Sequence, residues 1–274
     1  MGSFSFKATF YFERGRPMAW GILPLASIME WGFLSLPHII SLLLVLIFIT
    51  VVHFSLAKLN QEIKTIVLFI FSLIPIAAII YNLIVFHVPL ENLPLNVTDL
   101  CALVMPFVIL FPRKGPANLL LLDVLSAACG LLFNNAPESG YFSLTSIFYY
   151  FPMMMSFSLP ILIFTLDFSD LDIKYLPITL GIGVVMYVSV HFINLGINAY
   201  CAANNVLNWA GEVISVNYMA TIYPTTNILK AFYSILPFEF WYMAVGLVVV
   251  FIYLVLIYGI HNYVFRVRKT KEMK

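Results

Sequence analysis

Charged residues are scarce in this sequence of 274 residues. Lys, Arg, Asp and Glu together make up 10% of the chain, whereas about one quarter is usual for a soluble domain. Hydrophobic residues make up 62%, and the mean hydropathy is +0.99. The net charge of +1 comes without a basic stripe, so the sequence does not predict a nucleic-acid partner. This composition excludes an ordinary water-soluble domain and favours a membrane protein.

Cysteines and cofactor motifs are also few. The three cysteines, Cys101, Cys129 and Cys201, have no CxxC spacing, which argues against a disulfide framework and a zinc site. The sequence has no Gly-rich phosphate loop, HExxH, GxSxG or Walker motif. We therefore predict no cofactor and no metal.

Long apolar segments fill most of the chain, and a bilayer core needs about 20 apolar residues per helical span. Because chain in hydrocarbon must satisfy its own backbone polar groups, these segments predict an all-α polytopic bundle of about seven transmembrane helices over residues 33–262. An interfacial segment, 1–32, precedes the bundle and a basic tail, 263–274, follows it. The predicted spans are 33–57, 65–86, 96–112, 117–134, 144–166, 175–200 and 237–260.

The distribution of Lys and Arg predicts the orientation of the bundle. Basic residues are usually enriched on the cytoplasmic side. Placing the C-terminus inside puts most of them there, including the five of the tail, so we predict an N-out, C-in multi-pass protein of a cell membrane. The inner set is Lys58, Lys64, Arg113, Lys114, Lys174, Arg266, Arg268, Lys269, Lys271 and Lys274.

The connection over residues 201–237 is the longest between two predicted spans and is rich in Asn, Thr and aromatic residues. Two interpretations stay open for it. Non-helical backbone is tolerated at membrane depth where protein or a wet cavity satisfies it, so the segment could cap a pocket. Alternatively, it is an exposed linker with an interfacial helix around Ile228 to Leu236.

Polar side chains within the predicted spans are the most informative residues, since each costs at least a few kcal/mol in hydrocarbon. With a rise of 1.5 Å per residue, six of them fall at one depth in the outer leaflet, whereas Asp123 lies in the inner half of its span. The six are His38, Asn82, Thr98, Asp99, His191 and Asn194.

This polar layer has two interpretations. In the first, Thr98 is a nucleophile, His38 or His191 is its base, and Asp99 orients the base. In the second, the same side chains form hydrogen bonds between helices, each worth on the order of 1 kcal/mol.

Several motifs resemble those of a known family. Leu93 to Leu100, LPLNVTDL, resembles the LPLHLCDL motif of the YwaF family of bacterial integral membrane proteins, which is related to a eukaryotic ether-phospholipid acyltransferase. Asp123 to Leu132, DVLSAACGLL, and Val216 to Met219 followed by Pro224 are similar to further motifs of that family. The resemblance extends over about residues 31–262.

The resemblance implies a fold that acts on lipid acyl chains, similar also to androgen-induced fatty-acid-ester hydrolases with a Thr nucleophile and a His. This chain departs from the family pattern, because Asn96 and Thr98 stand where the family has His and Cys, and the fifth-helix His is replaced near Ser158. The candidate ligand-binding residues are Asn82, Asn96, Asn194 and Asn217.

Three functions are consistent with these features. The first is a lipid-binding protein that acts on lipid acyl esters, with membrane lipids as partners. The second is a non-catalytic subunit of a membrane complex, with protein partners. The third is a small-solute transporter, which is disfavoured because a pathway needs polar groups at several depths.

Overall fold

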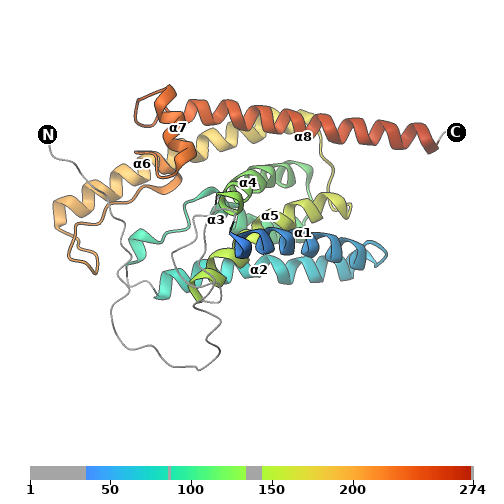
Figure 1. Ribbon diagram of the computed structural model, residues 1–274, viewed down its shortest axis with the longest axis horizontal. Helices are drawn as coiled ribbons and strands as arrows, with labels where there is room; N and C mark the ends of the chain where they lie inside the picture. The colour runs from blue at the N-terminus through green and yellow to red at the C-terminus, as the bar shows by residue number, and fades with distance from the viewer. Residues whose placement is uncertain (1–34, 86–87, 134–143, 273–274) are drawn as a thin grey trace.

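The computed structural model describes residues 35–85, 88–133 and 144–272, and within these ranges the chain is helical with no β-strand. The predicted interfacial segment 1–32 lies outside the described residues. The described residues form eight α-helices, and Figure 1 shows that their arrangement is elongated. They are α1 (Leu36–Ala57), α2 (Gln61–Val85), α3 (Val97–Leu110), α4 (Lys114–Leu132), α5 (Leu144–Thr165), α6 (Leu176–Asn204), α7 (Asn227–Ile235) and α8 (Met243–Glu272).

Six of these helices are long and apolar enough to cross a membrane, namely α1, α2, α4, α5, α6 and α8. A seventh, α3, is apolar but shorter, with 14 residues. The prediction of an all-α membrane bundle is therefore confirmed, with six candidate spans in the described residues, whereas the predicted span over 96–112 is the shorter helix α3. Helix α8 continues through most of the predicted tail as far as Glu272.

Helices α1 to α5 share one hydrophobic core, in which α4 and α5 have the most extensive contact. Helices α3 and α4 form the expected hairpin, with only Phe111, Pro112 and Arg113 between them. The start of α3 is fixed locally by a capping box, because Asn96 and Asp99 satisfy backbone groups that the first helical turn leaves unpaired.

Helices α6 and α8 lie side by side along one flank of the α1–α5 group and meet it through α4 (Figure 1). A second core around Leu121, Leu254 and Tyr258 makes this contact. Only 11% of the most apolar stretch of α6 and 17% of that of α8 are buried, compared with 44% for α5. Helices α6 and α8 therefore turn most of their apolar surface away from the protein.

The connection between α6 and α8 is folded back onto the end of α6. It contains the 3₁₀ turn η4 (Tyr218–Ala220) and then α7, whose first turn is capped by the Thr226 side chain. Helix α7 packs on α8 and confirms the helix expected around Ile228 to Leu236. Apart from η4, residues 205–226 form a non-helical segment whose backbone needs hydrogen-bond partners.

Candidate functional site

The non-helical segment is anchored to α6 by buried asparagines. Asn194 is fully buried, and its side-chain amide donates to the Tyr218 carbonyl at 2.9 Å and to the Thr221 hydroxyl at 2.8 Å. The Asn194 side-chain oxygen also accepts from the Tyr218 N–H at 3.1 Å. One turn later, Asn198 binds both the N–H and the carbonyl of Val216. These side chains replace the hydrogen bonds that regular secondary structure would supply.

The same segment is tied to the chain that leads into α3. The Tyr218 hydroxyl donates to the Leu90 carbonyl and accepts from the Leu93 N–H at 3.0 Å. The Asn96 side-chain oxygen accepts from the Met219 N–H at 3.2 Å. We call this set of residues the anchoring cluster; it consists of Asn96, Asn194, Asn198, Asn217, Tyr218 and Thr221.

The anchoring cluster holds a backbone that is locally unfavourable. Met219 and Ala220 both have positive φ values, of 53° and 50°, which residues other than glycine rarely adopt. The carbonyl of Ala220 accepts a hydrogen bond from the buried Tyr242 hydroxyl. Such a conformation persists because the surrounding contacts fix it, so the cluster acts to stabilise the fold of this segment.

The Tyr218 hydroxyl gives this interpretation a pH-dependent test. Its burial raises the pKa of Tyr218 from 10.0 to about 12. Below about pH 10 the phenol is neutral in the folded and unfolded states, but above it the unfolded state ionises first, so stability falls as the pH rises further.

We expect Tyr218→Phe to cost about 1 to 2 kcal/mol at neutral pH, because two hydrogen bonds are lost. The difference in stability between wild type and variant should shrink as the pH is raised from about 9 to about 11, as measured by chemical unfolding in detergent. The exposed Tyr223→Phe is the matched control. A difference that stays constant over this range would contradict the buried hydroxyl.

Three of the four predicted ligand-binding asparagines belong to the anchoring cluster. Asn194 and Asn96 are described above, and Asn217 binds the Tyr223 carbonyl and the Ile222 N–H within its own segment. Asn82 is half-buried on α2, whereas the anchoring cluster consists of residues at the start of α3, on α6 and in the segment after α6. The structure thus gives Asn96, Asn194 and Asn217 backbone partners.

The four predicted catalytic residues have separate surroundings. His38 is fully buried, and its Nε2 donates to the carbonyl of Leu131 at 2.7 Å, at the end of α4. Asp99 takes part in the capping box with Asn96. The His191 ring packs against Phe240 on the chain before α8, with ring centroids 4.6 Å apart.

Thr98 is half-buried in the first turn of α3. Within the described ranges, no hydrogen bond joins its hydroxyl to His38 or His191. A threonine nucleophile needs a neighbouring base. The arrangement therefore supplies the lipid-ester mechanism with its residue types but not with a hydrogen-bonded nucleophile and base.

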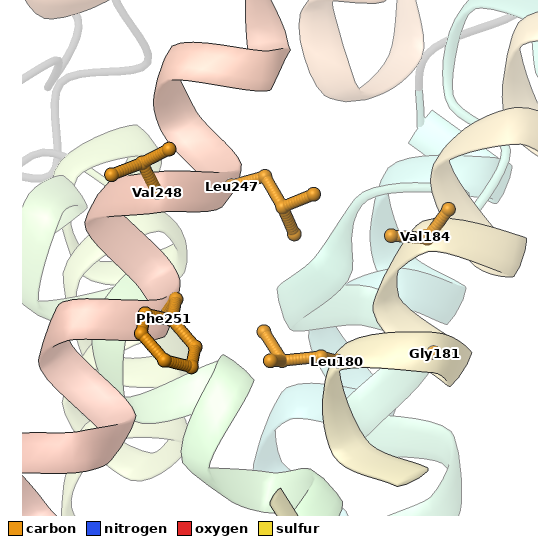
Figure 2. Close-up of a pocket in the computed structure, with 6 residues that line it drawn as sticks. All are labelled: Leu180, Gly181, Val184, Leu247, Val248 and Phe251. Atoms are coloured by element: carbon orange, nitrogen blue, oxygen red, sulfur yellow. The ribbon is translucent and has the colours of Figure 1, made fainter. Parts of the chain in front are cut away.

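An apolar groove lies between α6 and α8, with a volume of about 290 Å³. In Figure 2, side chains from the two helices face one another across it, with Leu247 and Phe251 opposite Leu180 and Val184. Gly181 leaves one wall open, since a methyl group placed there would contact nothing. The lining residues are Leu180, Gly181, Val184, Leu247, Val248 and Phe251.

Sequence reasoning did not find the groove or three members of the anchoring cluster, Asn198, Tyr218 and Thr221. The groove residues are apolar like the rest of their spans, so hydropathy gives no signal for them. Asn198 could have been found, because it follows Asn194 by four residues and therefore lies on the same helical face. Tyr218 carries no comparable signal, since its partner segment at residues 90–93 is more than a hundred residues away.

Comparison of the chain with models of known protein families, with curated proteins and with solved structures finds no match. The class of the protein therefore follows from its fold alone. It is a multi-pass α-helical membrane protein, with an ordered asparagine-anchored segment between its last two long helices and an apolar groove between those same helices.

Proposed function

We propose that this chain is a lipid-binding protein of a cell membrane, oriented N-out and C-in, and that a phospholipid acyl chain lies in the groove between α6 and α8. The observation that carries the proposal is the groove itself. Its wall consists of apolar side chains, and Val184, Leu247, Val248 and Phe251 are each between 39% and 57% exposed. In a bilayer, an open apolar hollow on two spanning helices is bordered by hydrocarbon, and acyl chains are the molecules that can fill it.

Packing is the physical basis of this binding. Lipid tails are as apolar as the groove, so water exclusion gives little preference for a bound over a free lipid. A hollow that stays empty forfeits dispersion contacts along its whole lining, whereas an acyl chain that fits recovers them. The groove therefore favours tails whose shape follows the gap beside Gly181.

Lipid binding has more structural support than lipid-ester chemistry, for which the YwaF-like motifs were the argument. Binding needs only the groove. Ester chemistry needs a base beside Thr98, and in the described residues no hydrogen bond joins Thr98 to His38 or to His191. The polar layer contributes to the stability of the bundle in this proposal, in line with the role of hydrogen bonds between membrane helices.

Val184→Trp tests the proposal, because the indole fills the groove from the α6 side. In native mass spectrometry after mild-detergent purification, wild type should retain a phospholipid. The variant should retain about tenfold less, which corresponds to about 1.4 kcal/mol of lost packing. Val185→Trp is the matched control, since Val185 is the next residue, is exposed and does not line the groove.

Two outcomes would contradict the proposal, and a third would extend it. Equal lipid retention in both tryptophan variants would place the lipid elsewhere. A dimer that Val184→Trp dissociates would mean that a second copy of the chain fills the groove. Release of fatty acid from the bound lipid by wild type, but not by Thr98→Ala, would show that the chain acts on the lipid as well as binding it.

A further inference from the structure

The groove between α6 and α8 is closed at one end by a hydrogen bond. The Tyr187 hydroxyl of α6 donates to the carbonyl of Phe240, on the turn that leads into α8, at 3.0 Å. Tyr187 follows the lining residue Val184 by three residues, and Phe240 precedes the lining residue Leu247 by seven. Since α6 runs toward this bond and α8 runs away from it, the bond marks the end of the groove nearest α7.

The Phe240 side chain takes part in this closure. Its ring packs against the rings of Tyr187 and His191, with centroids 5.2 Å and 4.6 Å away. Phe240 has a φ of 63°, a left-handed conformation that residues with a bulky side chain rarely adopt. The hydrogen bond from Tyr187 and the two ring contacts hold it there. Phe240 therefore lies as a fixed aromatic side chain between the two helices.

The opposite end of the groove is closed by a hydrophobic cluster. Leu176 and Leu180 of α6 pack against the buried residues Leu121 of α4 and Leu254 and Tyr258 of α8, which form the centre of this cluster. Along α6 the cluster lies on the N-terminal side of the groove, and along α8 it lies on the C-terminal side. The two helices are thus joined beyond both ends of the groove.

Helix α4 forms the floor of the groove. It contacts both α6 and α8, and Leu122 of α4 packs against Gly183 of α6. On the other side, the lining residues Val184, Leu247 and Val248 are exposed, and Figure 2 shows the gap between the two helices that carry them. In a membrane, the groove therefore opens sideways to the acyl chains of the bilayer.

The two closed ends limit the length of a straight ligand. Leu176 and Tyr187 are eleven residues apart, which corresponds to about 17 Å along α6. An extended stearoyl chain is longer than this, so a saturated tail in the groove has to bend out through the open side. A cis double bond places a bend in the chain before binding. A ligand that already has its bound shape loses less conformational freedom when it binds.

We propose that the groove selects phospholipids with a cis-unsaturated acyl tail, and that Phe240 determines this selectivity by closing the end nearest α7. The inference rests on the proposed lipid binding and adds which tail is bound. Tails of equal length offer nearly equal dispersion contacts to the apolar lining, so the preference comes from the shape of the tail.

Binding of three matched lipids tests the selectivity. The purified and delipidated chain is titrated separately with phosphatidylcholines that share a palmitoyl tail and carry oleoyl, elaidoyl or stearoyl as the second tail. Native mass spectrometry gives the bound fraction. Wild type should bind the oleoyl lipid about fivefold more tightly than the stearoyl lipid, which corresponds to about 1 kcal/mol. The elaidoyl lipid has a straight trans double bond and should bind like the stearoyl lipid.

Phe240→Gly tests the residue that determines the selectivity. Glycine adopts a positive φ without strain, so the variant should fold, and loss of the ring opens the end nearest α7. The preference for the oleoyl lipid should then fall below about twofold. Phe238→Ala is the matched control, because Phe238 lies two residues earlier and is exposed. It should keep the preference of wild type.

The outcomes separate this inference from the proposed function. Equal binding of the three lipids by wild type would overturn the selectivity and leave lipid binding intact. An unchanged preference in Phe240→Gly would overturn the role of Phe240. If wild type binds none of the three lipids, the proposed function itself fails. The comparison of oleoyl with elaidoyl lipid in wild type keeps the selectivity testable if Phe240→Gly does not fold.

Discussion

Asn194→Ala is expected to lower the free energy of unfolding by about 3 kcal/mol. The substitution removes three hydrogen bonds from a fully buried site and leaves the N–H and carbonyl of Tyr218 without their side-chain partner. Buried groups left unsatisfied cost about 1 to 3 kcal/mol each, and partial relaxation of the segment reduces the sum. Unfolding by titration with a denaturing detergent measures the change.

Asn204→Ala is the matched control for this prediction. Asn204 lies on the same helix, is exposed, and donates only to the carbonyl of Tyr200 one turn earlier. Its replacement should change the stability by less than about 0.5 kcal/mol. Similar effects from the two substitutions would mean that the asparagine anchor does not stabilise the segment after α6.

Asn118→Ala, near the start of α4, is expected to lower the free energy of unfolding by a comparable amount. Asn118 is fully buried, and its amide donates to the carbonyls of Lys114, at 2.6 Å, and Asp170, at 3.2 Å. Its side-chain oxygen accepts from the Tyr258 hydroxyl of α8 at 2.7 Å. The substitution thus disconnects α4 from both the α5–α6 turn and α8, at a cost of about 3 kcal/mol in the same unfolding assay.

The neighbouring ion pair supplies the control for Asn118. Lys114 and Asp170 are 2.6 Å apart, with side chains 48% and 71% exposed. Asp170→Ala keeps the backbone carbonyl that Asn118 binds and should cost less than about 1 kcal/mol. If Asn118→Ala and Tyr258→Phe have fully additive effects in the double variant, the proposed hydrogen bond between them does not contribute.

Much of the fold could be predicted from the sequence, because hydrophobic length determines where a chain can cross a bilayer. The predicted spans agree with α1 to α5 to within a few residues. Helix α6 runs beyond the predicted end at residue 200 because it stops only at Asn205, which caps it in a left-handed conformation. The predicted end is too early, since Cys201, Ala202 and Ala203 are still apolar.

The candidate site was less predictable, because sequence gives the depth of a residue more readily than the direction of its side chain. The sequence places Thr98, His38 and Asp99 at one depth. In the structure, the His38 side chain is directed to the Leu131 carbonyl on α4, and the Asp99 side chain turns back to cap its own helix. Which face of a helix meets which neighbour depends on the packing of all helices together. The groove shows the same limit, since its residues do not differ in type from those that simply contact lipid.

The central claim, that an acyl chain occupies the groove between α6 and α8, is tested most directly by a structure of the full chain in lipid nanodiscs. The account predicts elongated density along Gly181 and Val184 of α6 that also contacts Phe251 of α8. A groove closed by direct contact between the two helices, or filled by protein side chains, would contradict it.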